Sequence, residues 1–156
     1  MDDEGLLRAC IDLARRGMED GVGGPFGAVM ACNGQLIAEG RNLVTSTHDP
    51  TAHAEVVAIR RACELRRSHV LADCEIFCSC EPCPMCLGAI YWSRIGRVVF
   101  AASQEDAAAI GFDDARLYAE LRLPPDARTL RTEQMLRSDA ARMMSDWRQV
   151  PKDRHY

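Results

Sequence analysis

Three cysteines fall within eight residues in the segment SCEPCPMC (79–86), and two of them, Cys83 and Cys86, have C-x-x-C spacing. Earlier in the chain, the segment TAHAEV places His53 and Glu55 two positions apart. Thiolates and a neutral imidazole are ligands that zinc prefers, and three protein ligands leave a tetrahedral ion one open position for water. The sequence therefore predicts a catalytic zinc site with His53, Cys83 and Cys86 as metal ligands. Glu55 is expected to stay unbound and to transfer protons.

The elements that hold these residues must bring two distant segments together. Thr51 is a suitable N-cap for a helix over 51–66, which places His53 and Glu55 near its first turn. Pro84 opens a second helix directly after the first cysteine of the C-x-x-C pair. If the two helix N-termini face each other, the imidazole, the thiolates and the carboxylate converge on one pocket. The free N–H groups of a helix start also favour thiolate over thiol.

The rest of the pattern predicts an α/β fold. Apolar residues at helical spacing predict a helix over 3–20, and Asn33-Gly34 between two short apolar runs predicts a β-hairpin. Alternating strands and helices then predict a three-layer αβα sandwich around a mixed sheet of about five strands. The later strands are expected at 74–79, 97–102 and 128–132, and a closing helix at 138–150.

The length and charge of the chain narrow the classes of function. A chain of 156 residues can bury a core as a single domain over 1–156, so its eight cysteines are not needed to hold it together. The first twenty residues are charged and amphipathic and resemble neither a signal peptide nor a membrane span, so we expect a cytoplasmic protein. A net charge of -4 disfavours a nucleic-acid partner and favours a small substrate.

Other interpretations of the cysteines remain to be weighed. A thioredoxin-like redox pair has the same spacing, but that interpretation gives no role to the residues around His53. Cys80 as a fourth ligand would close the metal shell and make the site structural; Pro82 separates it from the helix, and Glu55 would then be idle. In a reducing compartment disulfides are not expected. The other cysteines are predicted to be buried apolar residues, namely Cys10, Cys32, Cys63, Cys74 and Cys78.

The motifs H-x-E and P-C-x-x-C together are the signature of zinc-dependent nucleobase deaminases, and His53–Glu55 and Pro82–Cys86 match them. The chain resembles the cytidine deaminase-like superfamily nearly end to end. Within it, the segments GGPFGAV, NLVTSTHDPTAHAEV, SCEPCPMCLGAIYWSR and GFDD resemble the bacterial guanine deaminases. This resemblance implies a cytidine deaminase-like fold with one zinc ion per subunit. It also implies hydrolysis of guanine to xanthine and ammonia, in which metal-bound hydroxide attacks the amine-bearing ring carbon and Glu55 shuttles the proton.

The resemblance also implies a substrate pocket. Guanine presents N–H donors and an acceptor oxygen, so a carboxylate can read its amine-bearing edge and an amide can read another edge. Asp114 suits the first task, with a second catalytic role in protonating the leaving amine, and Asn42 suits the other. Alternatively, GFDD is only a turn whose aspartates cap the next helix, and the two phenylalanines are core residues. The residues implied to line the pocket are Phe26, Asn42, Ala54, Phe112 and Asp114.

In the resembled family the C-terminal tail is exchanged between two subunits. The resemblance thus implies a homodimer in which the tail, about 151–156, brings Tyr156 to the active site of the partner. Related deaminases that act on guanosine, cytidine, an aminotriazine or tRNA adenosine are the nearest alternatives. A structural zinc module that binds a protein or RNA partner without turnover is an alternative from another class.

Overall fold

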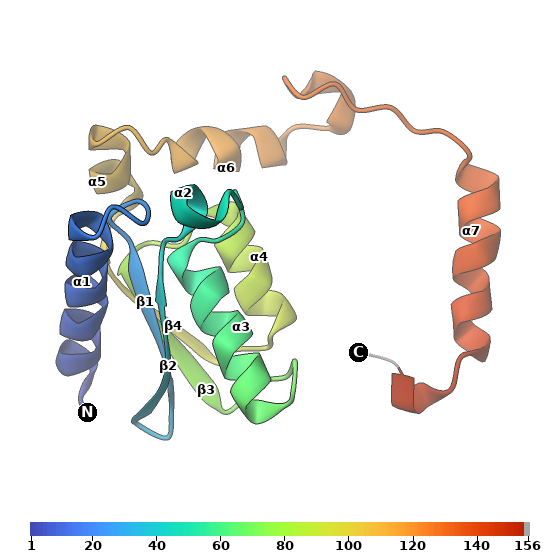
Figure 1. Ribbon diagram of the computed structural model, residues 1–156. Coiled ribbons are helices and arrows are strands. Elements are labelled where there is room, and N and C mark those ends of the chain that lie inside the picture. Colours follow the sequence, from blue (N-terminus) through green and yellow to red (C-terminus); the bar gives the residue numbers. More distant parts are fainter. Residues whose placement is uncertain (155–156) are drawn as a thin grey trace. The chain divides into compact units, whose positions relative to one another are not determined.

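The computed structural model describes residues 1–154 of the chain (Figure 1). The backbone divides into two compact units, residues 1–118 and residues 119–156, and each is described by itself. The prediction of one domain over 1–156 stays a prediction. The elements that lie in or begin in the first unit are α1 (Asp3–Glu19), β1 (Gly27–Cys32), β2 (Gln35–Arg41), α2 (Val44–Thr47), α3 (Ala54–Arg66), β3 (Cys74–Cys80), α4 (Pro84–Trp92), β4 (Arg97–Ala102), α5 (Gln104–Ala109) and α6 (Asp114–Arg122).

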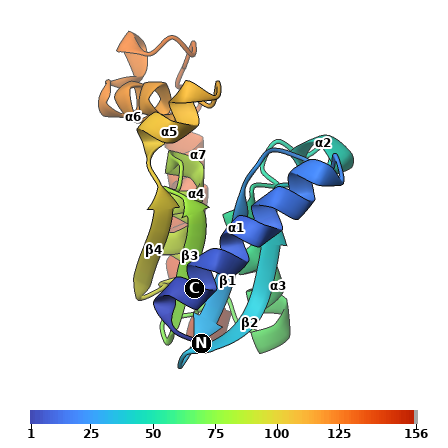
Figure 2. The same cartoon turned by 90° about the vertical axis from the view of Figure 1, so that its left-hand side faces the viewer.

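The strands form one mixed sheet in the order β2-β1-β3-β4. β1 pairs antiparallel with β2 and β3, whereas β3 and β4 are parallel. Helix α1 packs on one face of the sheet, where Figure 2 shows it in front of the strands, and α3 and α4 pack on the other. The predicted αβα sandwich is therefore confirmed. Within the described residues the sheet has four strands rather than about five, because residues 128–132 form no strand.

Strand β1 is buried along its whole length, and its alternating side chains serve two cores. Val29 and Ala31 belong to the cluster beneath α1, while Ala28 and Met30 belong to the cluster beneath α3. A strand covered on both faces reads as a continuous apolar run rather than as an alternating one. The hairpin that joins it to β2 is confirmed, since both turn residues, Asn33-Gly34, have the positive φ that a two-residue I′ turn requires.

A disulfide joins Cys32 and Cys74, so the expectation of no disulfides is wrong for this pair. The two residues are register partners in the antiparallel pair β1–β3, with Cα atoms 4.2 Å apart. A separation of 42 residues along the chain conceals this contact until the register is known. The prediction of buried thiols holds for Cys10 and Cys78, and Cys63 is half-buried.

The second unit contains the end of α6, α7 (Arg137–Asp146) and three short 3₁₀ segments, Pro125–Ala127, Trp147–Gln149 and Lys152–Arg154. Helix α7 confirms the predicted closing helix, although it ends before position 150. None of residues 119–154 is buried. Across the described part of the chain, every helix is too short or too polar to span a bilayer.

Candidate active site

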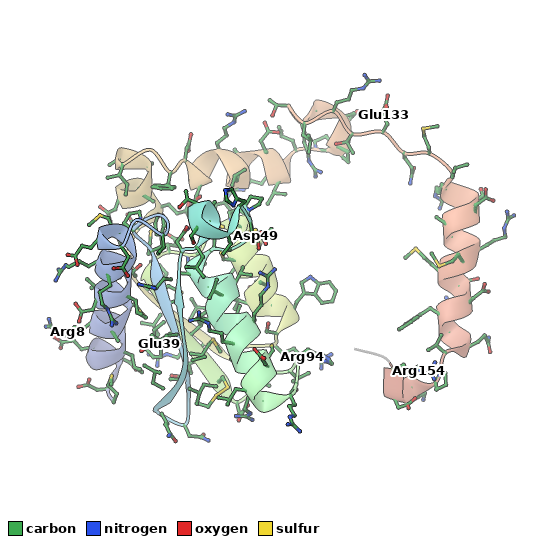
Figure 3. The ribbon with its side chains drawn as sticks, in the orientation of Figure 1. Arg8, Glu39, Asp49, Arg94, Glu133 and Arg154 are labelled. Carbon is green, nitrogen blue, oxygen red and sulfur yellow. A yellow bond between two sulfur atoms is a disulfide. The ribbon has the colours of Figure 1, made fainter. Side chains whose placement is uncertain are left out.

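Two helix N-termini present the predicted metal ligands. His53 is the N-cap of α3 and Cys83 is the N-cap of α4, and both have extended backbone. The prediction that Thr51 caps α3 is wrong. Its hydroxyl instead donates to the Asp49 carboxylate at 2.6 Å, in the loop ahead of the helix. Asp49 is labelled in Figure 3. The imidazole therefore projects from the cap position itself rather than from within the helix.

Close packing of α3 on β2 fixes this helix start. A Cβ atom on Gly40 would lie 2.0 Å from the carbonyl oxygen of Ala54, the first residue of α3. Any larger residue at position 40 would push the helix away from the sheet. The first turn of α3, which carries Glu55 two residues after His53, can therefore take this position only because residue 40 in β2 is glycine.

The three predicted ligand atoms form a nearly equilateral triangle. The Nδ1 atom of His53 lies 3.5 Å from the Sγ atoms of both Cys83 and Cys86, and the two sulfurs are 3.6 Å apart. Usual zinc bond lengths in a tetrahedron place a nitrogen and a sulfur ligand about 3.6 Å apart and two sulfurs about 3.8 Å apart. The triangle therefore fits a zinc ion bound by three protein ligands, with the fourth position open.

Cys80 is turned away from this triangle. Its Sγ atom donates to the carbonyl oxygen of Ser103 at 3.4 Å, on the side of the chain that leads into α5. A second group of donors around Cys32 and Cys74 lies at the far end of β3, where the two sulfurs are joined to each other. In the described residues, His53, Cys83 and Cys86 thus form the group of free donors suited to a metal ion.

The pKa values of the two cysteines of the triangle shift in opposite directions. The contact between the two sulfur atoms lowers the pKa of Cys83 to about 4 and raises the pKa of Cys86. The hydrogen bond between the His53 ring and Cys83 raises the pKa of that imidazole. One thiolate ligand is therefore formed at neutral pH, and metal binding releases the remaining proton.

Glu55 lies beside the triangle in the first turn of α3. It is only 8% exposed, and burial raises the pKa of its carboxyl group. The same side chain lines a hollow together with residues from three other segments. This hollow is small. Its lining residues are Phe26, His53, Glu55, Glu81, Cys83, Phe112 and Asp114.

Comparison with known proteins places this site in a family. Residues 1–102 match the family described as the cytidine and deoxycytidylate deaminase zinc-binding region. The chain belongs to this zinc-binding deaminase family. It is 46% identical over 156 residues to the guanine deaminase of Bacillus subtilis, and the match covers all of both chains. It is also 39% identical over 102 residues to the tRNA-specific adenosine deaminase of Aquifex aeolicus, covering 65% of this chain and 67% of that one.

Solved structures give the same result. The X-ray structure of guanine deaminase from Bacillus subtilis has a TM-score of 0.96 at 46% identity and covers 100% of this chain and 99% of its own. A structure of guanine deaminase from Nitrosomonas europaea has a TM-score of 0.67 at 35% identity, covering 71% of this chain and 64% of its own. The donor set of the deaminase site, one imidazole and two thiols, matches the zinc that names the family.

Three of the predicted substrate residues meet at the mouth of this deaminase site. The rings of Phe26 and Phe112 are in edge contact, with centroids 4.8 Å apart and planes at 88°. Asp114, at the start of α6, is half-buried, and burial raises its pKa. The alternative that the aspartates of GFDD only cap the next helix holds for Asp113, which accepts a hydrogen bond from the backbone N–H of Arg116. Asp114, however, lines the hollow.

The other predicted substrate residues are placed differently. Asn42 is 5% exposed, and its side-chain oxygen accepts hydrogen bonds from the N–H groups of Gly24 and Val44, both at 3.2 Å. If Asn42 binds a substrate, the amide NH₂ is therefore the group that donates the hydrogen bond. Ala54 is fully buried between His53 and Glu55. Tyr156 lies outside the described residues.

Two residues of the site are missing from the sequence prediction. Glu81 lines the hollow, and its carboxylate accepts hydrogen bonds from the side chain of Gln104 at 2.8 Å and from its backbone N–H at 3.3 Å. Tyr118 donates from its hydroxyl to the carbonyl oxygen of Pro82 at 2.9 Å. Glu81 stands directly before the P-C-x-x-C motif, a position that could have drawn attention to it. Tyr118 carries no comparable local signal.

Proposed function

We propose that this chain is a guanine deaminase, which converts guanine and water to xanthine and ammonia. In this reaction the exocyclic C–N bond breaks and a C–O bond forms at the same ring carbon. The observation that carries the proposal is a zinc-type triangle beside a buried carboxylate, in a chain that matches a guanine deaminase over its whole length. We infer one zinc ion per chain, because the described residues offer one such triangle.

Bound zinc would act as a Lewis acid that makes a proton of water available near neutral pH. Glu55 takes up that proton, since its carboxylate faces the hollow next to His53 and is not one of the ligands. Because burial raises its pKa, the carboxyl group can accept a proton and return it to the substrate. The return goes to the ring nitrogen or to the leaving amine.

The carboxylate of Asp114 accepts hydrogen bonds from the N–H groups on the amine-bearing edge of guanine. It can also pass a proton to the departing ammonia, since burial raises its pKa as well. Phe26 and Phe112 provide flat apolar surfaces for the purine ring, and the amide NH₂ of Asn42 can donate to an acceptor on the ring. Movement of the Phe112 ring, which is 40% exposed, would admit the purine.

We also propose a homodimer in which the tail, about 151–156, reaches the partner subunit and Tyr156 closes the partner's pocket. Large apolar side chains on residues 119–154 are exposed, and none of these residues is buried. Such a run of uncovered apolar surface is typical of an interface. The exposed apolar residues are Leu121, Leu123, Leu130, Met135, Leu136, Met143, Met144 and Trp147.

We place the enzyme in the cytoplasm. Six of its eight cysteines are free thiols, which suits a reducing compartment, and the one disulfide, Cys32–Cys74, is the feature that argues against it. Sedimentation of the full-length protein tests the dimer, and deletion of Arg154 to Tyr156 tests the tail. The truncated protein should fold normally and show a higher KM or a lower kcat for guanine. Full activity after the deletion would contradict the role of the tail.

The substrate assignment is tested with purified, zinc-loaded protein. Ammonia release is measured from guanine, guanosine, adenine and cytidine, and xanthine formation is followed by ultraviolet absorbance. We expect turnover of guanine far above the others. Preference for guanosine or cytidine, or inosine formation in tRNA, would assign the site to one of the related deaminases. Tight zinc without turnover of any of them would favour a structural zinc module.

A further inference from the structure

Helix α6 is joined to the metal-binding turn by one of its own side chains. The Tyr118 hydroxyl donates to the carbonyl oxygen of Pro82 at 2.9 Å, and Pro82 directly precedes the ligand Cys83. Tyr118 also lies one helical turn after Asp114. Residues four apart occupy the same face of a helix. The helix face that carries Asp114 is therefore tied to the chain segment that carries a metal ligand.

Neighbouring α5 is held more firmly than α6. It begins with a capping box between Ser103 and Asp106, it buries Ala107, and its first residue, Gln104, makes two hydrogen bonds to Glu81. By contrast, none of the described residues of α6 is buried. Between the two helices, Gly111 has a φ of 96°, which leaves a bend at this point. Few contacts therefore hold the first turns of α6 in position. One of them is the hydrogen bond from Tyr118 to Pro82, next to the predicted metal ligand Cys83.

Substrate entry makes different demands on two residues of this segment. The Phe112 ring is 40% exposed and in edge contact with Phe26 beside the small hollow, so we expect this ring to turn aside when a purine enters. Asp114, two residues later, has to stay in place to meet the N–H groups of the purine. The segment therefore needs an anchor that holds Asp114 while Phe112 swings. Tyr118 is on the far side of Asp114 from Phe112, which is where such an anchor has to be.

We propose that Tyr118 is a positioning residue, whose hydrogen bond to the Pro82 carbonyl holds Asp114 in register with guanine at the metal site. This inference rests on the proposed guanine deaminase activity. Tyr118→Phe removes the hydroxyl and keeps the ring, on a half-buried residue of a surface helix. We expect kcat/KM for guanine to fall about three- to tenfold, as the loss of one neutral hydrogen bond predicts. Zinc content and the thermal midpoint should stay close to those of the wild type.

A double-mutant cycle separates positioning from a general structural role. If Tyr118 acts through Asp114, then Tyr118→Phe lowers kcat/KM in the wild type and has no further effect in the Asp114→Asn background. Tyr91→Phe removes a hydroxyl from a tyrosine of α4 that is 75% exposed, so it serves as the matched control and should change nothing. An equal loss in both backgrounds would show that Tyr118 merely supports the fold and would overturn the proposal.

The same cycle is also measured through the dissociation constant for guanine, because the turnover of Asp114→Asn can be too slow to measure. In the Glu55→Gln background, which still offers the three zinc ligands, the dissociation constant for guanine is compared with and without Tyr118→Phe. We expect weakening by the same three- to tenfold factor, and none once Asp114→Asn is also present. Unaltered guanine affinity in the first comparison would contradict the proposal.

Failure of this inference is distinguishable from failure of the proposed function. If the zinc-loaded wild type releases no ammonia from guanine, the assignment of the substrate is wrong. If the wild type is active and Tyr118→Phe matches it in kcat, KM and guanine affinity, only the role of Tyr118 is wrong.

Discussion

Glu55→Gln is expected to remove deamination of guanine while leaving the fold and the metal ligands in place. The side chain is 8% exposed, lines the hollow and is not part of the ligand triangle. Glutamine has the same length and cannot accept and return a proton, so the change removes proton transfer without creating a cavity. One general acid–base residue contributes about 10²–10⁴-fold. In free energy this is about 2.7–5.5 kcal/mol of the activation barrier, so kcat should fall by at least about 10²-fold.

The stability of this variant gives an independent check. Burial raises the pKa of Glu55, which means that the folded protein disfavours its charged form. Stability from this group is therefore present at low pH and is lost as the pH rises through the raised folded-state pKa. At neutral pH a neutral glutamine removes that cost. The free energy of unfolding of Glu55→Gln should consequently equal or exceed that of the wild type in urea titrations at pH 7.

The assay follows xanthine formation by ultraviolet absorbance, with zinc content measured on the same preparations. Glu64→Gln is the matched control, because Glu64 is an exposed glutamate on the same helix and should tolerate the change. We expect the control to keep wild-type turnover and both variants to keep their zinc. Undiminished kcat in Glu55→Gln would refute the assignment of this carboxylate as the proton carrier. Loss of zinc in Glu55→Gln would instead show that Glu55 supports the ligand set.

Further outcomes follow from the ligand geometry and the packing. Cys83→Ser should lose zinc and activity, whereas Cys80→Ser should keep both by metal analysis; zinc loss in the latter would make the site a closed, four-ligand one. Gly40→Ala should cost about 1–3 kcal/mol in urea unfolding and lower turnover, because its Cβ would overlap the start of α3; wild-type values would contradict the close packing. Reduction of the Cys32–Cys74 disulfide should lower the free energy of unfolding by about 2–4 kcal/mol. Six titratable thiols are expected in the unfolded, unreduced protein, and eight would contradict this bond.

The metal site was predictable from the sequence because its chemistry is local. The C-x-x-C pair occupies one helical turn, and a proline at the start of that helix marks where the turn begins. His53 and Glu55 lie two residues apart at another helix start, so two short motifs sufficed to name all four groups. The exact cap was missed, since Thr51 bonds to Asp49 rather than to α3. Competing local hydrogen bonds of this kind are decided by loop geometry, which residue type alone does not specify.

Features that depend on the register of distant segments were not predictable. The Cys32–Cys74 disulfide requires knowing that β1 pairs antiparallel with β3 and in which register. The bond from Tyr118 to Pro82 likewise joins residues 36 positions apart. A strand was expected at 128–132, where the described residues form none. Tertiary context overrides strand propensity in such short segments.

Zinc titration of metal-depleted protein, with guanine turnover recorded at each step, tests the central claim most directly. Xanthine formation should rise in proportion to added zinc and reach its maximum at one ion per chain, because the described residues offer one such triangle, His53, Cys83 and Cys86. Full turnover of guanine without zinc would contradict this assignment. So would a protein that binds one equivalent of zinc and still forms no xanthine.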